Sequence, residues 1–356
     1  MAKIDMFFKV MLEKGASDLH LTSGAPPLIR VNGEMTPLTD KILSAQNLND
    51  LLMEIVPPEK QEKFQQNHDL DMAHEFGEFR FRCNLFFQRK GMGAVFRVIP
   101  TKIKSAEELG LPPQVLKLTT FKKGLVLVTG ATGSGKSTTL ASMIDHINRN
   151  RKEHILTIED PIEFVHENKS CLINQREVGP HSNSFATALR AALREDPDII
   201  LVGEMRDLET IELAITAAET GHLVFGTLHT ASAAKTVDRI INVFPTNQQE
   251  QIRTMLSESL RGVISQNLLK KADGKGRVAT LEILLSTSAS NNLIRENKTF
   301  QMNSVIQTGK KDGMQTMDQA IMDHLMAKRI TPEEAYSYAV DKKPFESFLK
   351  GKPSVE

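Results

Sequence analysis

The residues with the clearest chemical meaning run from Gly130 to Ser137, GATGSGKS. They match the phosphate-binding pattern G-x-x-x-x-G-K-[ST] at every defined position. A short apolar run at 125–129 precedes them, as expected of a buried strand. Apolar residues at three- and four-residue spacing follow them, as expected of an amphipathic helix. The sequence therefore predicts a phosphate-binding loop (P-loop) between a strand and a helix.

This loop predicts binding of a nucleoside triphosphate. Its glycines let backbone N–H groups turn toward phosphate oxygens, and the helix N-terminus adds partial positive charge. Lys136 is expected to reach the β- and γ-phosphates, and Ser137 is expected to ligate Mg²⁺. The residues predicted to bind ATP are Gly130, Ala131, Thr132, Gly133, Ser134, Gly135, Lys136, Ser137 and Thr138.

Other polar residues flank three further predicted strands, at 155–158, 199–202 and 223–227. In a parallel sheet, ligands bind at the carboxyl ends of the strands. Side chains that follow a strand are therefore expected to face the P-loop, and side chains that precede one are expected at the far end. The first group is Glu159, Asp160, Glu163, Glu204, Thr227 and His229, and the second is Asp196, Asp198 and His222.

Hydrolysis of a phosphoanhydride needs charge neutralisation, a metal and a positioned water. Glu204 stands where a carboxylate could orient that water, and Glu163 is a second candidate. The position before Glu204, often a metal-binding Asp in P-loop proteins, is Gly203. Mg²⁺ is therefore expected on Ser137 and water, with help from Glu159 or Asp160. The alternative for each carboxylate is a surface acid that pairs with a helix end.

His222 and His229 raise the possibility of a metal site. They are seven residues apart on either side of one strand, so an extended chain separates them by about 23 Å. They cannot share a metal unless the chain folds back, and no cysteine lies near them in the sequence. His229 fits a γ-phosphate sensor better. For His222, a structural role with local hydrogen bonds is equally consistent with the sequence.

The elements around these residues alternate between strands and helices, which favours an α/β fold with a mostly parallel sheet. A further strand at 278–285 is expected at or beyond the sheet edge. Asp207 and Thr331 are expected to cap helices. Predicted helices lie at 137–149, 184–195, 208–220, 231–241, 247–265, 315–328 and 332–340. The predicted domains are 1–100, a linker at 101–113 and an ATPase domain at 114–356 with C-terminal helices.

The first hundred residues predict a small α+β domain. Its last three strands, at 70–76, 79–89 and 94–99, are expected to form an antiparallel meander, and Asn32-Gly33 is a hairpin signal. Within the meander, Arg80 and Arg82 alternate with apolar residues, and Arg97 lies on the next strand. These arginines either form a solvated sheet face or reach the phosphates of a neighbouring subunit, a role that suits a guanidinium group.

The composition excludes several classes of protein. Lys+Arg and Asp+Glu are both 44, so no global charge attracts nucleic acid or an anionic membrane. Aromatic residues are only 5% with no Trp, which weighs against stacking platforms for a nucleic acid strand. The two cysteines, Cys83 and Cys171, form no metal-spaced cluster and suit a reducing cytoplasm. No apolar run approaches the ~18 residues of a membrane span, and the N-terminus is too polar for a signal peptide.

Four ordered boxes carry a family resemblance. They are the P-loop, an aspartate box at 157–164, a Walker B segment at 193–204 and a histidine box at 220–230. On these residues, the chain resembles the type II/IV secretion ATPase superfamily and, within it, the PilT-type pilus-retraction ATPases. The tetracysteine zinc motif usual in pilus-extension and type II secretion relatives needs four cysteines. With two, the chain is similar to the retraction branch, and no zinc is expected.

The resemblance implies a PAS-like N-terminal domain, a RecA-like P-loop ATPase domain and a homohexameric ring with ATP between domains. It implies that Arg82 and Arg97 act in trans, and it adds His222 to the site. The implied function is a motor that hydrolyses ATP to power type IV pilus retraction and twitching motility. The motor would lie in the cytoplasm, peripherally at the inner membrane, with an inner-membrane platform protein and a paralogous retraction ATPase as partners.

Other functions stay open at this point. The family's C-terminal Ala-Ile-Arg-Asn-Leu-Ile-Arg-Glu appears as Ala-Ser-Asn-Asn-Leu-Ile-Arg-Glu at 289–296, and only its second half matches fully. The chain could therefore be an accessory retraction paralogue. A DNA-transfer or secretion motor of the same superfamily is a further alternative, as is a ring subunit that binds ATP as a structural ligand.

Overall fold

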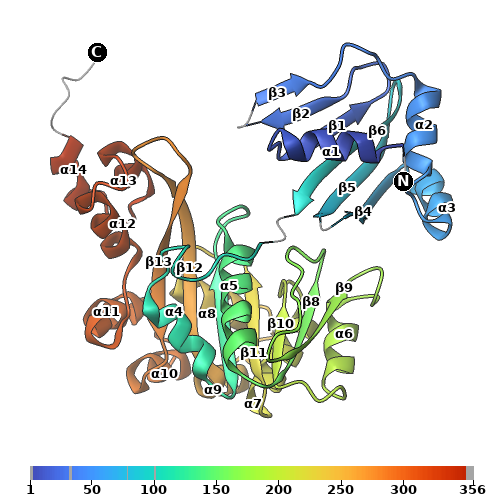
Figure 1. Cartoon of the computed structure of the whole chain (residues 1–356). Coiled ribbons are helices and arrows are strands. Elements are labelled where there is room, and N and C mark those ends of the chain that lie inside the picture. Colours follow the sequence, from blue (N-terminus) through green and yellow to red (C-terminus); the bar gives the residue numbers. More distant parts are fainter. Residues whose placement is uncertain (1–2, 32–33, 78, 100–101, 350–356) are drawn as a thin grey trace. The chain divides into compact units, whose positions relative to one another are not determined.

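A computed structural model describes residues 3–31, 34–77, 79–99 and 102–349. The chain forms two compact units, Met1–Lys102 and Ile103–Glu356 (Figure 1). The expected domain boundary at residues 100–101 lies outside the described residues, so the predicted domain division stays a prediction. Within the expected linker, Ala106 and Leu111 are buried in the core of the second unit.

The N-terminal unit is one six-stranded sheet in the order β3-β2-β1-β6-β5-β4. Its elements are α1 (Asp5–Glu13), β1 (Asp18–Thr22), β2 (Leu28–Val31), β3 (Glu34–Pro37), α2 (Ala45–Met53), α3 (Pro58–Asn67), β4 (Asp69–Phe76), β5 (Phe79–Gln88) and β6 (Gly91–Ile99). The predicted meander of β4, β5 and β6 is confirmed. The hairpin signal at Asn32-Gly33 lies outside the described residues.

Alternation along these strands directs one set of side chains to the core. Phe81 and Phe96 on neighbouring strands are fully buried, and Phe8 of α1 packs on both. The ring of Phe8 stacks on Phe81 with centroids 4.3 Å apart and meets Phe96 edge-on at 5.1 Å. Because helix α1 covers this apolar face, the polar residues of β5 and β6 lie on the opposite face.

The second unit is a seven-stranded sheet in the order β13-β12-β7-β11-β10-β8-β9. The strands are β7 (Gly124–Thr129), β8 (His154–Glu159), β9 (Leu172–Glu177), β10 (Ile199–Val202), β11 (Leu223–Leu228), β12 (Leu260–Lys270) and β13 (Arg277–Leu285). Six strands are parallel, and β13 pairs antiparallel at one edge. The predicted α/β architecture and the edge position of the 278–285 strand are therefore confirmed.

Helices pack on both faces of this sheet (Figure 1). Asp207 and Thr331 accept hydrogen bonds from backbone N–H groups three residues on, so both predicted caps are confirmed. The helices are α4 (Pro113–Lys117), α5 (Lys136–Asn150), α6 (Phe185–Ala192), α7 (Leu208–Glu219), α8 (Ala233–Asn242), α9 (Gln249–Ser259), α10 (Ser288–Arg295), α11 (Met302–Thr308), α12 (Met317–Met326), α13 (Pro332–Tyr338) and α14 (Lys343–Leu349).

The predicted helix at 247–265 is wrong in its second half. Helix α9 ends at Ser259, and residues 260–270 form β12 beside β7. Leu256, Leu260 and Ile264 continue a four-residue spacing, and all three are buried. A strand that is buried on both faces has no alternation to reveal it. Strand β9 was missed for the opposite reason, because its sequence, LINQRE, is largely polar.

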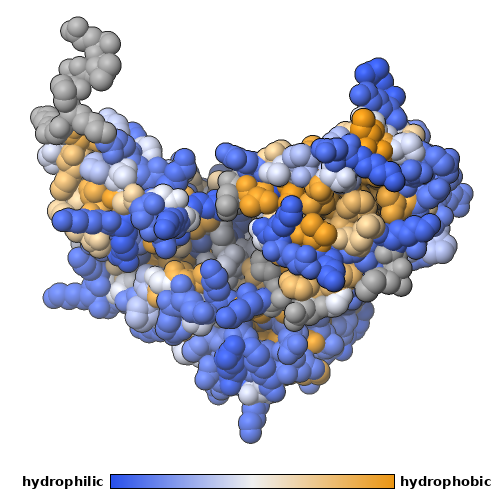
Figure 2. Space-filling model, turned by 45° about the horizontal axis from the view of Figure 1, so that its top comes forward, coloured by the Kyte–Doolittle hydropathy of each residue, from blue (hydrophilic) through white to orange (hydrophobic). Residues whose placement is uncertain are grey.

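Among the described residues, no helix is long and apolar enough to span a bilayer. Hydrophilic side chains cover most of the surface in view, and hydrophobic patches interrupt them (Figure 2). Both cysteines, Cys83 and Cys171, are buried as free thiols.

Candidate functional site

The P-loop connects β7 to α5 and depends on backbone conformations that favour glycine. Gly130, Gly133 and Gly135 have φ values of 142°, 77° and 88°. A Cβ on Gly130 would lie 2.3 Å from the carbonyl oxygen of Gln266 on β12. The first glycine is therefore required both by its conformation and by the close approach of the neighbouring strand.

Lys136 begins α5 and is largely buried. Its Nζ donates hydrogen bonds to the carbonyls of Gly130 at 2.9 Å and Ala131 at 3.1 Å. Burial lowers the pKa of Lys136, and the nearby charges of Glu204 and Glu163 oppose that shift. The ammonium group therefore lies within the loop, close to both candidate carboxylates, where an incoming phosphate can replace the carbonyl contacts.

Gln266 supports the P-loop from the side. Its Nε2 donates to the carbonyl of Ser134 at 2.8 Å, and its Oε1 accepts from Thr139 Oγ1 at 2.7 Å. All three residues are almost completely buried. The sequence reasoning missed Gln266 because the preceding residues were assigned to a helix. A correct assignment of β12 beside β7 would have placed it next to the loop.

Glu204 follows β10 as expected and makes two charged contacts through one oxygen. Its Oε1 lies 3.0 Å from Nε2 of His229 and 2.5 Å from Nε of Arg206. Partial burial alone would raise the pKa of Glu204. The hydrogen bond and charge of Arg206, with the charges of His229 and Lys136, hold this pKa below its usual range. Glu204 is thus an ionised acceptor beside the P-loop, and Arg206 is a neighbour that the sequence reasoning missed.

Glu159 follows β8 and is buried. Its Oε1 accepts from Thr157 Oγ1 at 2.7 Å and Gln175 Nε2 at 3.1 Å, and its Oε2 accepts from the Glu163 N–H at 3.3 Å. Burial raises the pKa of Glu159, and these hydrogen bonds partly oppose the rise. Both oxygens therefore already accept hydrogen bonds, and Oε2 holds the loop that carries Glu163, which leaves them poorly placed for a metal. Asp160, by contrast, is exposed.

The structure does not bring His222 to the P-loop. Leu223 pairs with Gly124 at the start of β7, whereas Leu228 pairs with Thr129 beside the P-loop. His222 therefore lies at the opposite end of the sheet from His229, as its place before the strand predicted. Its Nδ1 contacts the carbonyl of Ala217 at 3.0 Å, which is the local hydrogen bond that a structural role would require.

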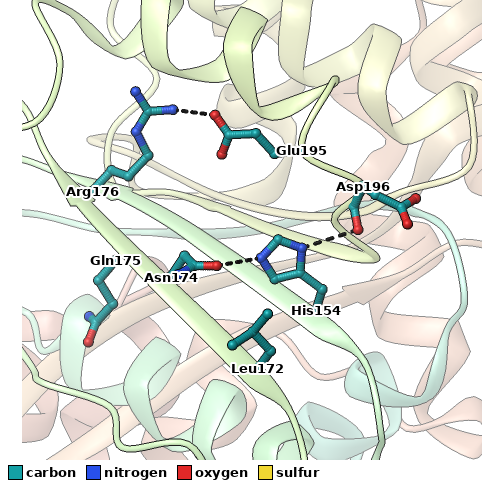
Figure 3. Close-up of a pocket in the computed structure, with 7 residues that line it drawn as sticks. All are labelled: His154, Leu172, Asn174, Gln175, Arg176, Glu195 and Asp196. Atoms are coloured by element: carbon teal, nitrogen blue, oxygen red, sulfur yellow. Dashed lines mark hydrogen bonds and ion pairs between the residues drawn. The ribbon is translucent and has the colours of Figure 1, made fainter.

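A hollow of about 730 Å³ in the second unit lies away from the P-loop. Figure 3 shows His154 between Asn174 and the backbone of Asp196, and Arg176 paired with Glu195. His154 begins β8 and Asp196 precedes β10, so this hollow lies at the amino ends of the strands. It contains neither the P-loop nor the carboxylates that follow the strands, and we do not assign the chemistry to it.

Arg82 and Arg97 lie side by side in the N-terminal unit. They are direct partners across β5 and β6, and Asp18 is the next partner of Arg97 on β1. Asp18 Oδ1 accepts from Arg97 Nε at 2.7 Å, whereas Arg82 is exposed. Burial alone would raise the pKa of Asp18, but Ser17 and Arg97 lower it. One buried carboxylate therefore stands beside two adjacent cations.

Over the described parts of the chain, no three His, Cys, Asp or Glu side chains gather closely enough to hold a metal ion. Ser137, at the second position of α5, is the P-loop hydroxyl that a phosphate-bound Mg²⁺ would require. A cation at this site therefore fits only as one carried in with phosphate.

Comparisons with known proteins agree with this arrangement. Residues 2–337 match the family described as "Type II/IV secretion system protein". The chain is 55% identical to the "Type IV pilus retractation ATPase PilT" of Pseudomonas aeruginosa, over 90% of this chain and 93% of the relative. It is 40% identical to the "Type IV pilus ATPase PilU" of the same organism, over 95% and 88%.

A solved structure gives the same result for the fold. The crystal structure of "the Pilus Retraction Motor PilT and Bound ADP" superposes with a TM-score of 0.91 at 49% identity. The superposition covers 98% of this chain and 100% of that one. The expected fold, an α/β ATPase unit preceded by a small PAS-like domain, is confirmed by this match.

Replacement of Gln266 by Ala is expected to weaken nucleotide binding. It leaves the Ser134 carbonyl and the Thr139 hydroxyl buried without their partner, at a cost of about 1–3 kcal/mol for each unsatisfied group. We expect roughly tenfold weaker binding of a fluorescent ATP analogue in a titration, because part of this cost falls on the loop conformation that binds phosphate.

Gln315→Ala is the matched control. Gln315 also donates its side-chain amide to a backbone carbonyl, but that carbonyl belongs to Leu281, the residue of β13 that pairs with Gln266, and not to the P-loop. Equal affinities of the Gln266 and Gln315 variants would show that Gln266 does not support phosphate binding.

Proposed function

Because this chain belongs to the type II/IV secretion system protein family, we propose that it is a motor ATPase that powers type IV pilus retraction. The observation that carries the proposal is the arrangement of a lysine, a carboxylate and a histidine at one end of the sheet. Lys136 lies in the P-loop, and the ionised Glu204 lies beside it with His229 at 3.0 Å. The printed names of the relatives supply the pilus context.

Each side chain of this site has a definable task in ATP hydrolysis. Lys136 neutralises charge on the β- and γ-phosphates. Glu204 accepts a hydrogen bond from the attacking water and orients it, which its ionised state permits. His229 lies at the end of the adjacent strand, where it can contact the γ-phosphate. Glu163 remains the second candidate for water activation, since its charge also reaches Lys136.

Magnesium would be held mainly by Ser137 and water, with Asp160 as the available carboxylate. Bound there, it would neutralise charge on the phosphates during phosphoryl transfer. Glu159 fits this task poorly, because its oxygens already accept hydrogen bonds from Thr157, Gln175 and Glu163. In this proposal Glu159 holds the loop, and Asp160 faces the solvent and the phosphates.

The proposed motor is a homohexameric ring in which Arg82 and Arg97 of one subunit complete the site of the next. The adjacent guanidinium groups on β5 and β6 supply the fixed positive charge that a developing phosphate charge needs. His222 is kept as a site residue only in this assembled state, since it lies far from the P-loop of its own chain.

The proposed location is the cytoplasm, at the inner-membrane base of the pilus, with a platform protein as partner. The higher identity to PilT than to PilU supports a primary retraction motor over an accessory paralogue. The divergent segment at 289–296 forms most of α10, and its matching Arg295 is near the C-terminal end of that helix. A paralogous retraction ATPase remains a proposed partner.

The first test is ATP turnover by purified protein. Lys136→Ala should abolish turnover by preventing phosphate binding. Glu204→Gln should reduce turnover at least roughly 100-fold with ATP binding retained, because it removes the carboxylate that orients water. Glu163→Gln decides whether the second carboxylate shares this task. Glu195→Gln, at the opposite end of the sheet, is the control that should keep full turnover. Undiminished hydrolysis by the Glu204 variant would contradict its assigned role.

The second test asks whether the arginines act in trans. A double Arg82→Ala, Arg97→Ala chain and a Lys136→Ala chain, each carrying a different tag, are co-expressed and purified through both tags. Each parent should be inactive alone, but mixed rings should regain part of the turnover wherever an intact P-loop meets intact arginines. Arg89→Ala, at another exposed position, should remain active by itself. Mixed rings as inactive as the parents would exclude action in trans.

The third test is made in cells. Deletion of the gene should increase the number of surface pili and abolish twitching, because extension continues without retraction. The wild-type gene should restore both, and the Lys136→Ala gene should restore neither. Loss of DNA transfer with twitching unchanged would favour a DNA-transfer motor of the same superfamily instead.

A further inference from the structure

Arg206 is held at the site by the backbone on both sides of it. On its N-terminal side, the Met205 N–H donates to the carbonyl of Thr227 at 3.0 Å, and Met205 is buried. On its C-terminal side, Asp207 caps α7 by accepting from the Thr210 N–H at 2.9 Å. The backbone of Arg206 therefore has little freedom, and its guanidinium group turns back to Glu204.

The contact with Glu204 does not resemble a buried structural ion pair. The side chain of Arg206 is 71% exposed, whereas that of Glu204 is 18% exposed. Exposed ion pairs contribute little to folding stability. The pair nevertheless lies at the carboxyl end of β10, beside the P-loop lysine. The location of this ion pair therefore favours a role in ATP hydrolysis over a role in folding stability.

The contacts that Arg206 and His229 make with Glu204 involve the same oxygen. Arg206 Nε lies 2.5 Å and His229 Nε2 lies 3.0 Å from Oε1. Oε1 is thus held from two neighbouring strand ends, by Arg206 after β10 and by His229 after β11.

We propose that Arg206 is a positioning residue for hydrolysis, which holds Oε1 of Glu204 so that Oε2 contacts the attacking water. This inference rests on the proposed ATPase function. It assigns Arg206 no contact with nucleotide. The charged groups around the carboxylate are Arg206 on its own loop, His229 after β11 and Lys136 on α5. Asp160 lies close enough to Arg206 to affect it, and Glu163 acts on Lys136.

Replacement of Arg206 should shift the pH dependence of kcat in one direction. Arg206 lowers the pKa of Glu204, so its removal raises that pKa toward the ordinary value. A carboxylate that orients water loses activity as pH falls through its pKa. The acid limb of kcat should therefore move to higher pH.

The experiment compares full-length Arg206→Gln, Arg206→Lys and Arg149→Gln proteins. Arg149 is the matched control, because its side chain is 60% exposed and paired with Asp145 at 2.7 Å, away from the site. We expect Arg206→Gln to lower kcat roughly tenfold, as misplacement of a catalytic group does, with KM for ATP within about twofold of wild type. Arg206→Lys should return the acid limb toward wild type, because it restores the charge. Arg149→Gln should match wild type throughout.

Two results would overturn the proposal. A kcat and pH profile of Arg206→Gln identical to wild type would show that Arg206 does not position Glu204. A rise in KM with kcat retained would instead make Arg206 a nucleotide-binding residue. Failure of the underlying ATPase function would give a different result. In that case the wild-type and Arg149→Gln proteins would themselves show no ATP hydrolysis beyond that of Lys136→Ala.

Discussion

The contact between the P-loop and strand β12 constrains the whole second unit. The loop can follow its path only because Gly130 has no side chain to meet the Gln266 carbonyl, which would lie 2.3 Å from a Cβ. The same strand then continues to the C-terminal helices. Leu269 is part of the cluster formed with α12 and α13, and the Lys270 N–H donates to Glu334 Oε1 at 2.7 Å. A change in the loop that moves Gln266 therefore acts on the strand that carries these helices.

Glu159 and Glu204 lie at the ends of neighbouring strands, and their surroundings shift their pKa values in opposite directions. Glu159 is buried, and burial raises its pKa, while its Oε2 accepts a hydrogen bond from the loop of Glu163. Glu204 is less buried, and Arg206, His229 and Lys136 together lower its pKa. Divergent pKa values in one site commonly mark different roles for chemically similar groups. In the proposed mechanism, Glu204 is the carboxylate that stays ionised and orients water, and Glu159 is the one that holds the neighbouring loop.

The sequence predicted the parts of the site that depend on local pattern. Lys136 and Glu204 follow strands that can be recognised in the sequence by their apolar runs. Because ligands bind at the carboxyl ends of parallel strands, both residues could be predicted to lie at the same edge of the sheet. Gln266 and Gln175 could not be found in this way. Their roles come from β12 and β9, one strand uniformly buried and the other polar, and from hydrogen bonds to residues far away in the chain. Arg206 was missed because an exposed arginine after a strand has no periodic signal.

The arginine pair on the N-terminal sheet places two positive charges at directly paired positions. Arg82 and Arg97 are direct cross-strand partners, and like charges in that position destabilise a sheet, on the order of 0.2–1 kcal/mol. Asp18 is almost fully buried and hydrogen-bonded to Arg97, so it offsets one of the two charges. Arg82 remains exposed beside it. A phosphate bound by another subunit would supply the missing charge, and its gain or loss on hydrolysis would change the energy of that contact. In the proposed ring, such a contact would couple the chemistry of one chain to the position of the next.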